Sequence, residues 1–251
     1  MENVVNDLLN YNNLKIVQCN DYFNFSLDSV LLPNFVKITP TIKSIIDLGT
    51  GNAPIPMILS TKVDDDVKLI GVEIQKEIYQ LAQQSLKINK LEKRISVLNI
   101  DMKDIFNYFD TDSFDVVTSN PPYFKNGENS IKNLNAVKSI ARHEIMIDID
   151  AIINISRKIL KNKGSLYMIH RTERFIEIIN KLKENNLEPK RVQFIYPKIN
   201  KESNLFLIQA VKNGKSGLKL EQPLIIHNND GSYKEEIIKL FGDEIDDTKK
   251  L

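Results

Sequence analysis

The chain has 251 residues, with 34 Lys and Arg against 33 Asp and Glu, so its formal net charge is only +1. This length suits one α/β domain with one sizeable core. The single cysteine, Cys19, excludes a disulfide or a cysteine-based zinc site within the chain. No apolar run approaches membrane-spanning length and the first residues show no signal-peptide pattern. We therefore expect a cytoplasmic protein that does not enter a membrane.

Charge is distributed unevenly along the chain. Residues 1–119 carry a net charge of −5, residues 120–220 carry +10 and residues 221–251 carry −4. A positive middle segment favours a polyanionic partner, although lysines that are merely solvated would give the same count. The charge alone leaves both interpretations open.

Strand and helix patterns alternate along most of the chain. The predicted strands, in chain order, cover residues 44–49, 68–74, 94–101, 113–120, 165–170, 190–197 and 204–212. The predicted helices cover residues 52–63, 75–90, 148–163, 175–182 and 232–242. The third of these helices has Asp148 as its cap and should end at Gly164.

Strands and helices that alternate at these lengths predict right-handed βαβ units and a Rossmann-like α/β fold. We expect a mostly parallel sheet of seven strands, with helices on both faces and an antiparallel C-terminal hairpin. Residues 1–40 are expected to form an N-terminal extension or lid, and residues 41–251 a single domain.

Ligands of such sheets bind at the carboxyl ends of the strands. After the first strand comes "DLGTGNAP", residues 47–54, in which Gly49 and Gly51 permit a tight bend close to a ligand. A glycine-rich turn can also be only a turn. Here Glu73 ends the second strand, where a carboxylate can accept hydrogen bonds from both hydroxyls of a ribose.

Asp47 distinguishes between nucleotide cofactors. Its carboxylate would repel the pyrophosphate of a dinucleotide but suits the ammonium group of S-adenosylmethionine. Ala53 and Pro54 stand where a dinucleotide fingerprint has its third glycine. Asp101, after the third strand, can accept a hydrogen bond from an adenine amino group or can cap the helix that follows, and both remain open.

The fourth strand ends in "SNPPYF", residues 119–124, which can neither continue a sheet nor start a helix at once. With "DLGTGNAP", "GVEI" and "NIDMKD", this motif resembles class I S-adenosylmethionine-dependent methyltransferases of the Asn-Pro-Pro-Tyr type, which methylate planar amino or amide nitrogens. More narrowly, the chain resembles the bacterial tRNA(Val) adenine-N6 methyltransferase family. Further matches are "FSLDSVLLPNFV" (25–36), "ARHE" (141–144), "HRTERFIEII" (170–179) and the segment 196–227.

The resemblance implies a class I methyltransferase fold, S-adenosylmethionine as cofactor and a tRNA substrate, methylated on the adenine just 3′ of the anticodon. The implied cofactor residues are Asp28, Asp47, Gly49, Gly51, Glu73, Ile74, Asp101, Met102 and Asn120. The implied catalytic residues are Asn120, Pro121, Pro122 and Tyr123. Asp28 has a competing interpretation as an acid in the first turn of a helix.

The chemistry of an exocyclic amine explains the Asn-Pro-Pro-Tyr motif. The lone pair of adenine N6 is shared with the ring, so this nitrogen is a poor nucleophile. The side-chain oxygen of Asn120 and the carbonyl of Pro121 can each accept one N6 hydrogen and favour a more tetrahedral nitrogen. The prolines hold these acceptors stiffly, and Tyr123 offers a face on which the base can stack. A rigid Pro-Pro turn without any such role is the competing interpretation.

Basic residues after the motif are candidates for phosphate contact, which sets affinity rather than sequence choice. They are Lys125, Lys132, Arg142, His143, Arg171, Arg174, Lys198, Lys201, Lys212 and Lys215. Arg142 and His143 could instead fix their own loop. His170 and His227 are typical of satisfied surface or core histidines. No metal site is expected, since the run 64–66 of aspartates fits a solvated turn.

Other function classes share parts of this pattern. Release-factor glutamine methyltransferases use the same acceptors but resemble one another in carrying a helical domain before the first core strand, whereas only about forty residues stand there here. Methylation of rRNA or DNA bases fits the core motifs equally well. A catalytically silent RNA-binding relative would have no use for Asp47 and Glu73. We expect a monomer or weak homodimer with no obligate protein partner.

Overall fold

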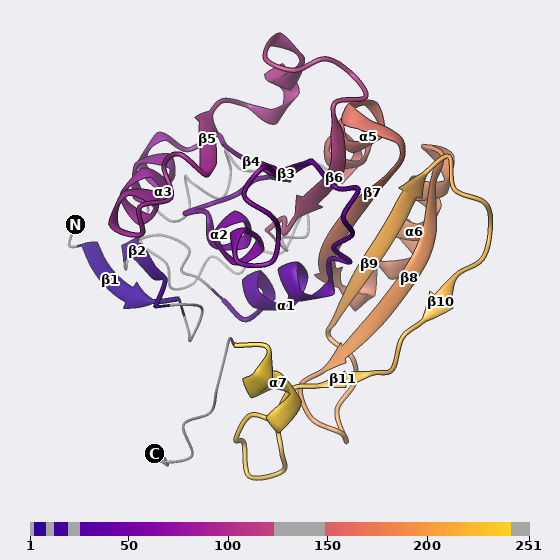
Figure 1. The fold of residues 1–251 in the computed structure, drawn as a ribbon. Coiled ribbons are helices and arrows are strands. Elements are labelled where there is room, and N and C mark those ends of the chain that lie inside the picture. The colour runs from indigo at the N-terminus through magenta and orange to yellow at the C-terminus, as the bar shows by residue number, and fades with distance from the viewer. Residues whose placement is uncertain (1–2, 9–12, 20–25, 123–148, 242–251) are drawn as a thin grey trace, which may run out of the picture.

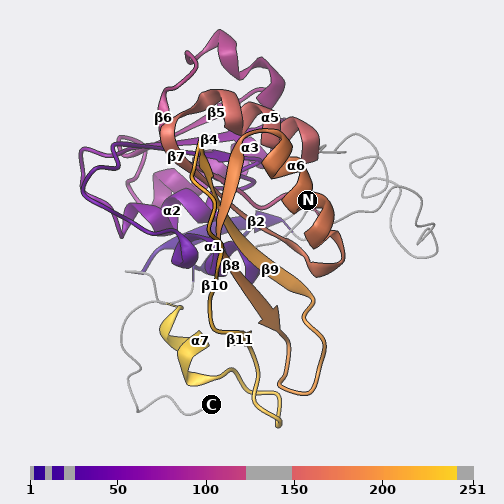
Figure 2. The same cartoon turned by 90° about the vertical axis from the view of Figure 1, so that its right-hand side faces the viewer.

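The described part of the chain is built around one twisted sheet between two layers of helices, with a small N-terminal hairpin beside it (Figures 1 and 2). The structure is a computed structural model that describes residues 3–8, 13–19, 26–122 and 149–241. The strands are β1 (Asn3–Asp7), β2 (Lys15–Cys19), β3 (Ser44–Leu48), β4 (Lys68–Glu73), β5 (Ile95–Asn99), β6 (Phe114–Ser119), β7 (Leu160–Arg171), β8 (Leu187–Tyr196), β9 (Leu205–Lys212), β10 (Lys219–Leu220) and β11 (Leu224–Ile225). The helices are α1 (Asp28–Phe35), α2 (Pro54–Ser60), α3 (Lys76–Ile88), α5 (Ile149–Ile159), α6 (Phe175–Glu184) and α7 (Glu235–Lys239), with 3-10 turns η1 (Met102–Asn107) and η2 (Thr172–Arg174).

The central sheet confirms the predicted fold class. Its strand order is β10-β8-β9-β7-β6-β3-β4-β5, and β11 also pairs with β8. Neighbouring strands from β5 through β7 are parallel, whereas β9 runs antiparallel to β7 and to β8. Seven of these strands are the predicted ones. The two others, β10 and β11, have two residues each and are too short to leave a periodic pattern in the sequence.

Helices cover both faces of the sheet, which explains why its central strands are continuous apolar runs. All five residues of β3 are buried. One core joins α1, α2, α3 and α7 to one face, and a second joins η1, α5 and α6 to the other (Figure 2). On α5 the buried side chains include Ile152, Ile155 and Ile159, the helical spacing that predicted this element.

The end of α5 differs from the prediction. The helix stops at Ile159, five residues before Gly164, and Asp148 lies outside the described residues. Strand β7 begins at once, and its pairing with β6 shifts register between Phe114 and Val116. A Cβ on Gly164 would lie 2.9 Å from the carbonyl oxygen of Lys161 and 3.0 Å from that of Asp115. Gly164 therefore permits a close backbone approach inside a strand rather than ending a helix.

The N-terminal hairpin of β1 and β2 is held against the main domain by backbone and side-chain hydrogen bonds. The amide of Val17 donates to Ser85 Oγ at 2.9 Å, and its carbonyl accepts from Asn52 Nδ2 at 2.9 Å. Asn89 also bonds both the amide and the carbonyl of Lys15, at 2.8 and 2.6 Å. Strand β2 is thus attached to α3 and to the turn after β3. The role of the N-terminal segment as a lid, and its boundary, stay predictions.

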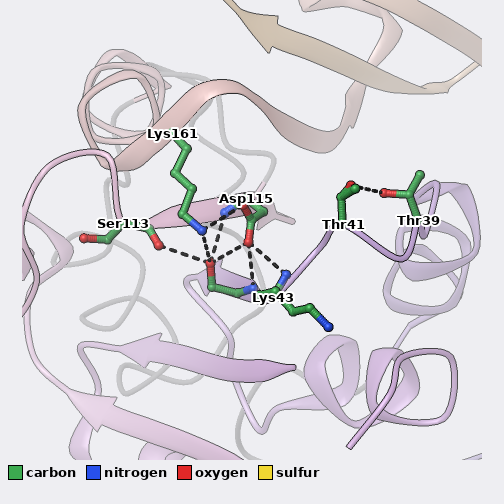
Figure 3. A network of polar contacts seen from close by, with 7 residues as sticks. Thr39, Thr41, Lys43, Ser113, Asp115 and Lys161 are labelled. Carbon is green, nitrogen blue, oxygen red and sulfur yellow. Dashed lines mark hydrogen bonds and ion pairs between the residues drawn. The ribbon is translucent and has the colours of Figure 1, made fainter. Parts of the chain in front are cut away.

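Asp115 joins three strands at the amino edge of the sheet (Figure 3). Its Oδ2 accepts hydrogen bonds from the amides of Lys43 and Ser44 and from Ser44 Oγ, each at 2.9 Å. Its Oδ1 accepts from Lys161 Nζ at 2.8 Å. One carboxylate on β6 therefore fixes the start of β3 and the start of β7.

We predict that Asp115→Ala lowers the free energy of unfolding at pH 7 by about 2–3 kcal/mol, because two amides, a hydroxyl and an ammonium lose their shared acceptor. Burial alone would raise the pKa of Asp115, but Lys161, the Lys43 amide and Ser44 outweigh it and hold the pKa below its usual value. The stability that ionised Asp115 contributes is fully present above the ordinary pKa of an aspartate. It is lost as the pH falls through the lowered pKa of Asp115 in the folded protein.

Urea unfolding between pH 7 and pH 3 measures both effects. Asp66→Ala is the matched control, since it removes an exposed carboxylate that also pairs with Lys43. An equal loss of stability from both variants would contradict the role of Asp115.

Candidate active site

The predicted cofactor residues meet at one edge of the sheet. The parallel strands β3, β4, β5, β6 and β7 all end there, and the register sets Asp47 opposite Gly71 on one side and Thr118 on the other. Glu73 is likewise opposite Asn99. Residues that are far apart in the sequence therefore share the carboxyl edge, where open α/β sheets bind their ligands.

The turn after β3 has the left-handed backbone that its glycines predict. Gly49 and Gly51 have φ values of 76° and 60°, and the amides of Gly49 and Thr50 both donate to the carbonyl of Val72. Ala53 also has a positive φ, of 70°, immediately before Pro54 opens α2. Ala53, which departs from the glycine pattern of the sequence, thus adopts a left-handed conformation that usually favours glycine.

Asp47 is a buried acid with one oxygen satisfied. It is 1% exposed, and its Oδ1 accepts a 2.6 Å hydrogen bond from Thr118 Oγ1. Its Oδ2 and the Thr50 hydroxyl are both buried without an ordinary hydrogen bond in the described part of the chain. Burial raises the pKa of Asp47 to about 6, although the nearby Thr118 and Thr50 hydroxyls lower it in part. A buried carboxylate oxygen without a donor is suited to a cationic ligand.

Glu73 closes the glycine turn. Its Oε2 accepts from the amide of Gly51 and its Oε1 from the amide of Gln75, both at 2.9 Å. Burial raises the pKa of Glu73, and these amides lower it in part. A carboxylate has more acceptor positions than these two bonds use, so Glu73 can still accept hydroxyl donors from a ligand.

Next to Glu73 lies an apolar surface that faces solvent. Ile74 is 47% exposed, whereas Met102 is buried. The side chain of Asn99 fixes this turn by donating to the carbonyls of Glu73 and Ile74, at 2.9 and 3.0 Å. Asn99 was not among the predicted site residues, and its position at a strand end was the only signal in the sequence. Asp101 Oδ1 accepts from the Lys103 amide at 2.9 Å, so the helix-cap interpretation of this residue is observed.

Asn120 follows the last residue of β6 at the carboxyl edge of the sheet, two residues beyond Thr118, which is opposite Asp47 in the register. Two hydroxyls before it connect β6 to β3, since Thr118 bonds Asp47 and Ser119 Oγ donates to the carbonyl of Leu48 at 2.9 Å. The sequence predicted these two residues only as part of a strand. Pro121 is buried, and Tyr123 lies outside the described residues.

Asp28 is the first residue of α1 and lies in its first turn. This matches the competing interpretation of Asp28 as a first-turn acid, and its contact with a cofactor stays a prediction.

The basic candidates fall at two edges of the sheet. Arg171 ends β7, Arg174 lies in η2, and Lys198 and Lys201 lie in the turn from β8 to β9, all at the carboxyl edge. Arg174 forms a two-point ion pair with Glu177. The remaining predicted RNA contacts Lys125, Lys132, Arg142 and His143 lie outside the described residues.

Lys212 is too buried to be the RNA contact that was predicted, whereas Lys215 is exposed and its RNA contact stays a prediction. Both follow the course of β9 to the amino edge, away from Asn120. Lys212 is 4% exposed, donates to the carbonyl of Leu160 at 2.6 Å and pairs with Asp112 at 2.8 Å. A lysine that is buried in this way serves the fold, because its ammonium is already coordinated by the protein.

His170 is a core residue, which is one of the two interpretations that its sequence left open. It is 1% exposed, and its Nδ1 accepts the amide hydrogen of Arg171 at 2.8 Å. Burial and the nearby Arg174 lower the pKa of His170 to about 4. Its imidazole is therefore neutral at physiological pH.

The described residues hold neither a metal-ligand cluster nor a membrane-spanning helix. These residues contain no group of three or more His, Cys, Asp or Glu side chains placed to hold a metal ion. The helices of the same ranges include none with the length and apolar character needed to cross a bilayer.

A mostly parallel sheet in this strand order, with a glycine turn and two buried carboxylates at its carboxyl edge, defines a Rossmann-like methyltransferase domain. The family model described as "Methyltransferase domain" matches residues 42–222. The chain belongs to this methyltransferase family.

Comparison with individual proteins agrees. Relatives from Tolumonas auensis and Cytophaga hutchinsonii, both named tRNA1(Val) (adenine(37)-N6)-methyltransferase, are 24% and 26% identical to the chain, over 85% of its length and 86% and 87% of theirs. Among solved structures, a predicted O-methyltransferase from Agrobacterium tumefaciens has a TM-score of 0.68 at 21% identity, covering 85% of this chain and 95% of that one. A geranyl diphosphate C-methyltransferase from Streptomyces coelicolor, solved with S-adenosyl-L-homocysteine, has a TM-score of 0.56 at 11% identity, covering 73% and 76%. At these identities the structural likeness shows the fold alone.

We predict that Asp47→Asn stabilises the protein without its cofactor, and more so as the pH rises. The pKa of Asp47 in the folded protein, about 6, exceeds the unfolded value of 3.8, so its contribution to stability falls as the pH rises between these values. The variant does not titrate there, and its advantage should grow by at most roughly 3 kcal/mol between pH 4 and pH 7. Urea unfolding across this range measures the difference. An advantage that does not change with pH would contradict the ionised, buried state of Asp47.

Proposed function

We propose that this chain transfers a methyl group from S-adenosylmethionine to N6 of an adenine in tRNA, with adenine 37 of tRNA1(Val) as the target. The observation that carries the proposal is the position of Asn120, directly after β6 and beside the strand that holds the Asp47 carboxylate. The curated relatives supply the substrate, since their names specify that nucleotide. The Asn-Pro-Pro-Tyr motif supplies the reaction type.

The residues at the carboxyl edge fit S-adenosylmethionine. The buried Oδ2 of Asp47, which has no ordinary hydrogen bond to a described residue, suits its ammonium group. Glu73 suits the two hydroxyls of its ribose. The exposed side chain of Ile74 offers an apolar surface for its adenine ring. Gly49 and Gly51 leave the turn free of side chains where the ligand must approach. When bound there, S-adenosylmethionine supplies a methyl group that is electrophilic because it is attached to a sulfonium.

Asn120 and Pro121 act on the nucleophile. The Asn120 side-chain oxygen accepts one N6 hydrogen of the substrate and the Pro121 carbonyl accepts the other, which turns the nitrogen lone pair out of the plane of the base. Ser119 positions Asn120 by linking the end of β6 to the Leu48 carbonyl. Methylation makes N6 cationic, and its surplus proton then passes to water without a strong base. Tyr123 is proposed to stack on the base.

Two further proposals concern where the protein acts and whether it needs a partner. We place its activity in the cytoplasm, where tRNA is available. We further propose that the protein works as a monomer or weak homodimer, with no obligate protein partner.

Incubation with radiolabelled S-adenosylmethionine and total tRNA, followed by digestion to nucleosides, tests the proposed function. We expect label in N6-methyladenosine, and a tRNA1(Val) transcript with guanine at position 37 should accept none. Label that enters rRNA, DNA or a release factor in preference to tRNA would contradict the proposed substrate.

Asn120→Ala should separate chemistry from cofactor binding. We expect S-adenosylmethionine affinity close to that of the unchanged protein but methyl transfer slower by about 100-fold or more, since an acceptor needed in the transition state is lost. Glu73→Ala should instead weaken cofactor binding. Calorimetry and a single-turnover methyl assay distinguish the two. Asn162→Ala, at the amino edge, is the matched control. Substantial turnover by Asn120→Ala would contradict the mechanism.

A further inference from the structure

Two turns lie side by side at the carboxyl edge, beyond the ends of β8 and β11 (Figures 1 and 2). We call residues 197–204 and 227–234 the turn pair. The amide of His227 donates to the carbonyl of Pro197 at 3.0 Å, and Lys198 Nζ donates to the carbonyl of Asn229 at 3.1 Å. The first turn is fixed to the end of β7 by the hydroxyls of Thr172 and Ser203, 3.0 Å apart. The turn pair is therefore a fixed part of the edge that holds Asn120.

The turn pair exposes two large apolar side chains. Ile199 is 62% exposed and Tyr233 is 42% exposed. The Tyr233 ring is nevertheless held in place, since it lies 4.7 Å from the His227 ring at 31° and 5.0 Å from the Phe241 ring at 87°. An aromatic ring that is rigidly supported and still reaches solvent is a suitable surface for another flat ring.

Charge on the turn pair is mixed. Lys198, Lys201 and Lys234 are opposed by Glu202 and Asp230, which leaves a small positive excess. Asp230 is already bonded by the amide and hydroxyl of Ser232, at 2.9 and 2.7 Å. The excess suits an anionic partner, but it is too small to make phosphate attraction the main contact. The apolar side chains must contribute a large share of any affinity here.

We propose that the turn pair binds unpaired nucleobases of the tRNA anticodon arm, next to the base that is methylated, with Tyr233 as a stacking surface and Ile199 as an apolar contact. This inference rests on the proposed function. Strand β8 lies three strand spacings from β6, or about 14 Å across the sheet, and the turn pair extends beyond the end of β8 at the same carboxyl edge as Asn120. Single-stranded loops are recognised by this kind of stacking between protein side chains and splayed bases.

Binding of a fluorescent tRNA1(Val) transcript at several salt concentrations tests the inference. Tyr233→Ala should weaken binding on the order of tenfold, whereas Tyr233→Phe keeps the ring and should bind as the unchanged protein does. Neither change removes a charge, so the slope of affinity against salt should stay the same. Lys201→Ala should instead reduce that slope by about one.

Ile199→Ala gives an independent reading, because the side chain is mostly exposed and its loss should leave the melting temperature unchanged. We expect weaker tRNA binding with unchanged affinity for S-adenosylmethionine. Ile88→Ala, on an isoleucine of α3 that is 45% exposed, should have no effect. Full tRNA affinity in both Ile199→Ala and Tyr233→Ala would overturn this inference alone. Failure of the unchanged protein to methylate tRNA would overturn the proposed function as well.

Discussion

Two carboxylates buried at the ends of adjacent parallel strands are the constraint on which the site depends. A pKa of about 6 for Asp47 means that its ionised form is disfavoured by roughly 3 kcal/mol relative to an exposed aspartate. Thr118 satisfies one of its oxygens, and the amide of Gly51 satisfies one of Glu73. Within the described residues, the second Asp47 oxygen is buried without a hydrogen bond of ordinary length. A cationic ligand at this edge would bond that oxygen. The buried carboxylate that lowers the stability of the protein without a ligand therefore favours ligand binding.

Hydrogen bonds from several neighbouring elements fix the geometry of this edge. The hydroxyls of Thr118 and Ser119 on β6 donate hydrogen bonds to β3. The side chain of Asn52 bonds the glycine turn to the N-terminal hairpin. At the opposite edge, Asp115 fixes where β3 and β7 begin, and hence the register that sets Asp47 beside Thr118. Precise placement of Asn120 is therefore a property of the whole sheet rather than of its own loop.

The fold and the charged residues of the site were predictable because both depend on local patterns. Buried strands are continuous apolar runs, and an acid or glycine directly after such a run falls at the carboxyl edge. Contacts between distant segments were not predictable. The sequence near Lys212 does not show that its ammonium bonds Asp112 and the carbonyl of Leu160. The sequence near Gly164 does not show that this glycine lies close to two backbone carbonyls instead of ending a helix. Asn99 was missed for the same reason, since its partners are the carbonyls of another strand.

A crystal structure with S-adenosylhomocysteine and the anticodon arm of tRNA1(Val) tests the central claim most directly. The account predicts the ligand's amino group within hydrogen-bond distance of Asp47 Oδ2, its ribose on Glu73, and N6 of adenine 37 between the Asn120 side-chain oxygen and the Pro121 carbonyl. Ligand density away from the turn at Gly49 and Gly51, or an adenine whose N6 points away from Asn120, would contradict it.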